Sequence, residues 1–79
     1  MNEQFKRIIA EVFGLNESDV NEQLTKEDVG SWDSLKQMDL VVTLEREYSI
    51  SLEIADIVKM VSVADIAEVL TDKGVSLED

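Results

Sequence analysis

The sequence predicts an all-α protein: a small bundle of three long helices and one short helix, with a long first loop. Three observations lead to this prediction. Apolar residues recur with helical spacing in separate segments, no segment shows the alternation of a convincing strand, and residues 14–33 have no sustained period. Since 79 residues suffice for one small domain, the whole of 1–79 is assigned to it.

The first helix is expected at residues 3 to 13. Its apolar side chains fall on one face, formed by Phe5, Ile8, Ile9, Val12 and Phe13. Asn2 suits the start of this helix and Gly14 its end. Residues 14–33 follow as an ordered loop, because a structureless loop of this length is unusual in a compact domain. A short helical turn is expected near residues 18–24. The apolar residues expected to pin the loop are Leu15, Val20, Leu24 and Val29.

The second helix is expected from Ser34 to about Tyr48, with Asp33 as its N-cap. Its core-facing stripe consists of Leu40, Val41, Leu44 and Tyr48. A second apolar stripe, displaced around the helix, consists of Leu35, Met38 and Val42. One stripe is enough for a surface helix. The second one is either core, if the helix is central, or an exposed patch kept for a partner, and the pattern alone does not decide.

Two helices are expected in the remaining chain. A short one covers residues 53–60, with Ile54, Ile57 and Val58 turned inward. The last one opens at Ser62, where Ser62 to Asp65 resembles a capping box with Asp in place of Glu or Gln. Its apolar residues are Val63, Ile66, Val69 and Leu70, and it ends near Gly74. Residues 75–79 are expected to fray.

Composition narrows the function classes. Eighteen acidic and seven basic residues give a net charge of -11, which argues against nucleic acid and anionic membranes, since phosphate binding needs clustered Lys and Arg. A basic partner would be attracted by this charge, although the same charge also serves solubility alone. With no signal peptide or membrane span, a cytoplasmic monomer without membrane insertion is expected.

The chain has no cysteine and no histidine. It therefore has no disulfide, no thiolate or histidine metal site, and no Ser-His or Cys-His nucleophile. No segment has the spacing of an EF-hand calcium loop, and nothing places two carboxylates in a tunable site. We expect neither catalytic residues nor a metal site.

The stretch GSWDSLKQMDL places Ser34 at the start of the second helix. A serine at a helix start is usually part of the cap. The free N–H groups of a helix N-terminus also favour an anionic group, so a phosphate ester on Ser34 would be well placed. Nothing beside Ser34 can act as its general base. Another protein would therefore have to modify it.

The sequence resembles the acyl carrier proteins and their peptidyl carrier relatives over roughly residues 3–73. The matching segments are Asp33-Ser34-Leu35, Met38-Asp39-Leu40-Val41, Leu44-Glu45, Tyr48-Ser49-Ile50 and Val61-Ser62-Val63-Ala64-Asp65-Ile66. The resemblance implies that Ser34 carries 4'-phosphopantetheine, transferred from coenzyme A by a magnesium-dependent phosphopantetheinyl transferase. The thiol of that arm would carry acyl groups as thioesters, so the protein would be a carrier and not an enzyme.

The resemblance also implies a partner surface on the second helix, facing acyl-loading and acyl-transferring enzymes with basic docking surfaces. Its expected residues are Asp33, Leu35, Lys36, Met38, Asp39, Val42 and Glu45. The inner stripe, with the first and last helices, would form a bundle able to open around an acyl chain.

Three residues depart from the carriers of fatty acid synthases. Lys36 stands where they have an acid, Lys59 makes the short helix less acidic, and Trp32 replaces a small residue. A partner whose basic residues contact the surface around Lys36 would be repelled. These departures favour a carrier for a specialised pathway, such as polyketide, modified-lipid, cell-envelope or amino-acyl chemistry, over housekeeping fatty acid synthesis. Trp32 either packs over the first loop or contacts a partner or the arm.

One alternative stays open at this point. An acidic interaction module that is never modified would use the same helix and the same outer stripe. Ser34 would then be only a helix-start residue.

Overall fold

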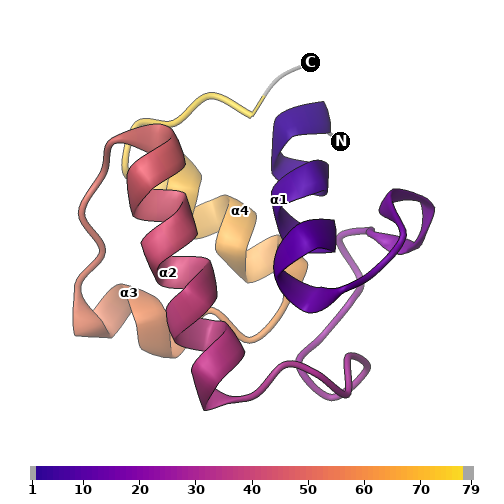
Figure 1. The fold of residues 1–79 in the computed structure, drawn as a ribbon. Helices are drawn as coiled ribbons and strands as arrows, with labels where there is room; N and C mark the ends of the chain where they lie inside the picture. The colour runs from indigo at the N-terminus through magenta and orange to yellow at the C-terminus, as the bar shows by residue number, and fades with distance from the viewer. Residues whose placement is uncertain (1, 78–79) are drawn as a thin grey trace.

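The computed structural model describes residues 2–77, and over this range it is all-α, as predicted. The elements are α1 (Glu3–Phe13), the short 3-10 helix η1 (Glu17–Asp19), α2 (Ser34–Tyr48), α3 (Ile54–Lys59) and α4 (Val63–Asp72), arranged as in Figure 1. Within residues 2–77 the only β pairing is an isolated bridge between Thr25 and Ser62. No helix in this range is long and apolar enough to cross a bilayer.

The core lies where α1, α4 and the inner face of α2 meet. Its largest fully buried side chains are Phe5, Ile9, Leu40, Leu44, Met60, Ile66, Leu70 and Val63. No polar or charged residue among 2–77 is buried. Because burying an aliphatic or phenyl side chain of this size contributes about 1.5–3 kcal/mol, these stripes hold the bundle together.

Helix α1 begins and ends at the predicted residues. The Asn2 side chain accepts a hydrogen bond from the Phe5 N–H at 3.0 Å. Gly14 ends the helix in the left-handed conformation, with φ of 67°, which glycine adopts without the steric cost that other residues meet. Asn2 therefore begins the helix and Gly14 ends it, as their residue types predict.

The first loop is ordered and pinned as expected. Val20 and Val29 are buried, and Leu15 and Leu24 pack partly against the core. The short helical turn lies slightly before the predicted residues 18–24, at η1. It does not continue, because Asn21 turns the chain by accepting a hydrogen bond from the Gln23 N–H at 2.8 Å.

Helix α3 differs from its prediction. Ile57 is partly buried, but Ile54 is 79% and Val58 is 70% exposed, so these two do not turn inward. With six residues, the helix makes fewer than two turns, and only one of its sides can reach the bundle. It starts with a reciprocal capping box between Glu53 and Asp56.

Only one of the two hydrogen bonds of the predicted capping box forms at the start of α4. The Ser62 Oγ accepts a hydrogen bond from the Asp65 N–H at 3.0 Å. Within residues 2–77, the Ser62 N–H does not donate a hydrogen bond to the Asp65 carboxylate. A shorter Asp side chain in place of Glu or Gln completes the box at α3 and leaves it open at α4.

The prediction of fraying is wrong for residues 75–77. Gly74 turns the chain with φ of 88°, and the Val75 N–H then donates to the Leu70 carbonyl at 3.0 Å. Val75 and Leu77 pack against the core, because two apolar side chains after the turn can still reach it. Residues 78 and 79 lie outside the described residues.

Candidate functional site

Asp33 caps the start of α2, as predicted, and this leaves the neighbouring Ser34 hydroxyl uncommitted. The Asp33 Oδ1 accepts a hydrogen bond from the Lys36 N–H at 2.9 Å. Ser34 is the first residue inside the helix and is exposed. Within residues 2–77 its side chain makes no hydrogen bond. A free primary alcohol therefore stands at the N-terminus of the longest helix.

Nearby serines are used differently. The Ser31 hydroxyl, three residues earlier, donates to the Phe13 carbonyl at 2.9 Å and ties the loop to the end of α1. The Ser62 hydroxyl caps α4. Of these three serines, Ser34 alone presents a hydroxyl that has no structural task.

Trp32 packs inside the protein and is not a surface contact. It is buried, its ring centroid lies 4.6 Å from that of Phe13, and its indole N–H donates to the Gln37 Oε1 at 2.6 Å. Of the two predicted roles, the structure confirms packing against the first helix and loop.

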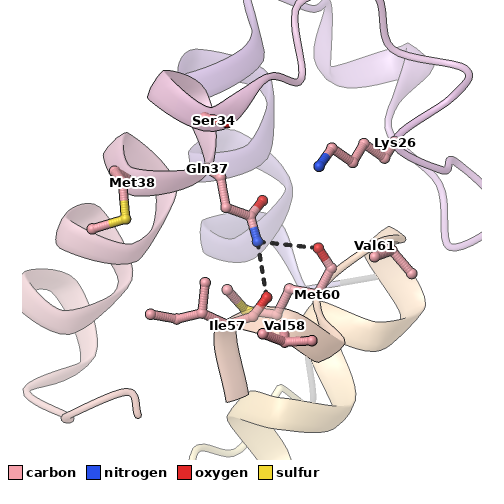
Figure 2. A pocket seen from close by; sticks show the side chains of 8 residues that line it. All are labelled: Lys26, Ser34, Gln37, Met38, Ile57, Val58, Met60 and Val61. Carbon is pink, nitrogen blue, oxygen red and sulfur yellow. Dashed lines mark hydrogen bonds between the residues drawn. The ribbon is translucent and has the colours of Figure 1, made fainter. Parts of the chain in front are cut away.

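Gln37 connects this tryptophan to α3, a role that the sequence reasoning missed. Its Nε2 donates to the carbonyls of Ile57, at 3.1 Å, and Met60, at 3.2 Å (Figure 2). All the hydrogen-bonding atoms of the Gln37 side chain are thus engaged. The first turn of α2 is fixed relative to the end of α3.

A groove of about 280 Å³ lies beside Ser34, between α2 and the α3–α4 link. The residues that line it are Lys26, Ser34, Gln37, Met38, Ile57, Val58, Met60 and Val61 (Figure 2). The walls are mainly apolar. Lys26 is the only charged residue among those that line the groove.

The outer stripe of α2 is an exposed surface and not core. Leu35 is 81%, Met38 52% and Val42 53% exposed. This decides between the two interpretations that the sequence left open. Ile54, Val58 and Val61 are also exposed, so apolar side chains stand on both sides of the groove.

The charged residues expected on the partner surface are placed unequally. Asp33 and Asp39 are exposed, whereas Lys36 and Glu45 are half-buried. The Glu45 carboxylate accepts a hydrogen bond from the Leu52 N–H at 2.8 Å and so holds the α2–α3 connection.

Asp56, in the first turn of α3, and Tyr48, at the end of α2, have shifted pKa values. The hydrogen bond from the Glu53 N–H, together with Lys73 at 3.0 Å, lowers the pKa of the Asp56 carboxyl. At the end of α2, burial raises the pKa of the Tyr48 phenol, whose oxygen is buried without a partner in residues 2–77.

The arrangement suits a residue that is modified by another protein. No side chain hydrogen-bonds to Ser34 as a base, and no group of three or more metal-ligating side chains occurs within residues 2–77. The exposed hydroxyl, the helix N-terminus and an adjacent groove with one ammonium group fit a phosphodiester on Ser34 that continues as a largely uncharged arm.

Comparisons with known proteins agree with this geometry. Residues 3–70 match the family model described as a phosphopantetheine attachment site. An acyl carrier protein of Thermotoga maritima is 37% identical over 68 residues, which cover 86% of this chain and 84% of that protein. The solution structure of a holo acyl carrier protein from Geobacter metallireducens is similar with a TM-score of 0.79, at 28% identity, over 90% of this chain and 82% of that one.

Proposed function

Because the chain belongs to the acyl carrier protein family, we propose that Ser34 is the residue that carries its covalent 4'-phosphopantetheine. The protein is a non-catalytic carrier. When attached, the arm supplies a thiol that holds acyl groups as thioesters, a group that this chain lacks among its own side chains. The chain itself contributes the attachment point and the surfaces that partner enzymes contact.

The uncommitted hydroxyl of Ser34 carries this proposal. A serine that caps its helix has its oxygen turned against the backbone, and moving it out of the cap to carry an arm into solvent would cost about 1 kcal/mol. Because Asp33 provides the cap, Ser34 can be esterified with α2 intact. The N-terminal N–H groups of α2 also favour the added negative charge.

Intact-mass measurement tests the attachment site. The folded apo protein is incubated with coenzyme A, magnesium and a broad-specificity phosphopantetheinyl transferase. We expect one added phosphopantetheine on the wild type and on Ser31→Ala, and none on Ser34→Ala. Ser31→Ala is the matched control, because it removes a serine hydroxyl three residues away. Loading of Ser34→Ala would refute the assignment, and no loading of the wild type would favour the unmodified interaction module.

We further propose that the outer face of α2 is the partner surface. It combines the exposed side chains of Leu35, Met38 and Val42 with the carboxylates of Asp33 and Asp39. Aliphatic contacts surrounded by acids suit an enzyme with an apolar docking site and a basic rim. Lys36 and Glu45 border this face, and Glu45 contributes less, because its carboxylate is already bonded to Leu52.

Substitution of this face tests the surface. Met38→Ala and Asp39→Lys are expected to reduce acyl transfer by the cognate partner about tenfold, as 1–2 kcal/mol of lost contact implies. The fold, measured by circular dichroism, should not change. Asp72→Lys, on an exposed position of α4, makes the same charge change elsewhere. Equal transfer by Asp39→Lys and Asp72→Lys would contradict the proposed surface.

The pathway is proposed to be specialised, for example polyketide, modified-lipid or amino-acyl synthesis. The support is Lys36, whose positive charge lies two residues after Ser34, and an α3 that shows exposed Ile54 and Val58. Lys36→Glu should increase acyl transfer with enzymes of housekeeping fatty acid synthesis about fivefold, the equivalent of about 1 kcal/mol for one exposed ion pair. Full activity of the unchanged protein with those enzymes would contradict the proposal.

A further inference from the structure

The ammonium group of Lys26 lies at the groove beside Ser34 without a partner of its own. Lys26 and Ser34 line the same groove, and Figure 2 shows the lysine side chain directed into it from the side opposite α2. Within residues 2–77 its Nζ makes no ion pair and no hydrogen bond, although Glu27 and Asp28 are its neighbours in sequence.

The backbone fixes where this lysine stands. The Lys26 N–H donates to the Val61 carbonyl at 2.8 Å, and the Val63 N–H donates to the Leu24 carbonyl at 2.9 Å. The Asp28 carboxylate closes the turn by accepting from the Thr25 N–H at 3.1 Å. The first loop is thus joined to the α3–α4 link, and only the flexible lysine stem has to be ordered for its ammonium group to bind.

The other groups of the groove leave an anion no competing partner. Met38, Ile57, Val58 and Val61 present apolar side chains. Gln37, the remaining amide, is fully engaged with Trp32 and α3. In a chain of net charge -11, the one cation that lines the groove beside Ser34 is suited to an anion that is attached there.

We propose that Lys26 binds the phosphodiester that joins the arm to Ser34, and thereby directs the first part of the arm along the groove between α2 and α3. The inference rests on the proposed attachment at Ser34. A phosphodiester carries one negative charge at neutral pH, and the lysine ammonium is a compact donor that can meet either of its free oxygens. The apolar walls then accommodate the methyl and methylene groups that follow.

A comparison of apo and holo proteins tests this contact. The melting temperature and the phosphorus NMR resonance are measured for the wild type, Lys26→Gln, Lys26→Arg and Arg46→Gln. Loading should raise the melting temperature of the wild type by about 1–8 °C more than that of Lys26→Gln, the range expected for one exposed ion pair in a domain of this size. Lys26→Arg, which keeps the charge, should behave like the wild type, and high salt should reduce the difference.

Arg46→Gln is the matched control, because it removes the same charge from an exposed position in the last turn of α2. Its response to loading should equal that of the wild type. The phosphorus resonance of the holo protein should move in Lys26→Gln and not in Arg46→Gln, a difference that a purely structural role of Lys26 would not produce.

Lys36→Gln distinguishes a direct contact between Lys26 and the phosphodiester from a general effect of any positive charge near Ser34. If Lys36→Gln lowers the stabilisation by loading as much as Lys26→Gln, the inference is overturned. Equal loading responses and equal phosphorus shifts in the wild type and Lys26→Gln overturn it too, while leaving the attachment at Ser34 intact. Failure of the wild type to load overturns the attachment and this inference together.

Discussion

Helices α2 and α4 both have a serine at their start, but the two serines are used in opposite ways. In α4 the serine is the cap itself, with Ser62 accepting the Asp65 N–H. In α2 the cap is Asp33, and Ser34 follows it with a free hydroxyl. A serine becomes available for chemistry where another residue has taken over its usual structural task.

The next turn of each helix continues this difference. Four residues after the cap, α4 has Ile66, which is fully buried, whereas α2 has Gln37, which bonds to Trp32 and to α3. The start of α4 is thus held by apolar packing and the start of α2 by polar contacts around an exposed site. Three predictions test this contrast, and a fourth extends it to the start of α3, from the largest expected effect to the smallest.

Ile66→Ala should cost about 2–5 kcal/mol, because it removes a fully buried branched side chain and leaves a cavity. Leu35→Ala, in the first turn of α2, should change stability by less than about 0.5 kcal/mol, since that side chain is 81% exposed. Urea unfolding followed by circular dichroism measures both. Similar losses in the two variants would show that the α2 start is packed as tightly as that of α4.

Gln37→Leu should cost about 1–3 kcal/mol, since the Trp32 N–H and the carbonyls of Ile57 and Met60 lose their partner. Gln37→Glu keeps the acceptor for Trp32 but places a carboxylate oxygen against the carbonyls of Ile57 and Met60, so its loss at neutral pH should be at least as large. Urea unfolding again provides the comparison. A neutral Gln37→Leu would mean that the α2 start is held by something other than these hydrogen bonds.

Ser62→Ala should cost about 1 kcal/mol, as the loss of an N-cap usually does. Ser34→Ala should be neutral or slightly stabilising, because Ala is a good helix residue and no hydrogen bond is lost. Thermal unfolding of the two apo variants distinguishes them. Equal destabilisation would place Ser34 among the structural serines.

The smallest effect concerns the start of α3, where Asp56 closes the capping box and pairs with Lys73 at 3.0 Å. The pKa of Asp56 is lowered on folding, first by the Glu53 N–H and then by Lys73. This carboxylate therefore stabilises the fold above the ordinary carboxyl pKa of 3.8, and the stabilisation is lost as the pH falls through the lower folded value. Asp56→Asn should flatten the acid side of the stability curve, measured by thermal unfolding between neutral and acid pH. An unchanged curve would contradict the role of this cap.

The long helices could be predicted because their stripes and caps are local. Phe5 to Phe13 show one face, and Asp33 and Ser62 are cap residues placed directly before helical patterns. Helix α3 was less predictable, because six residues do not define a face: Ile54 and Val58 are apolar, yet they stand in solvent. The packing of residues 75–77 was not predictable, because it depends on the turn at Gly74 that brings Val75 and Leu77 back to the core.

The candidate site was predictable only in part. The sequence identifies Ser34 and Asp33, since both are read from one short segment. Gln37 looks like any polar helix residue until the carbonyls of α3 are seen beside it. Lys26 lies in a loop whose path is set by hydrogen bonds with Val61 and Val63, and such pairings between distant segments leave no local pattern.

The Gln37–Trp32 hydrogen bond also makes the intrinsic fluorescence of the protein sensitive to the position of α3. Trp32 is the chain's single tryptophan, so its fluorescence comes from one place, two residues before Ser34. The indole is buried against Phe13 and bonded to the side chain that holds α3. A change in emission wavelength when a partner docks, or when the groove fills, would therefore signal movement of α3 in real time and without any added label.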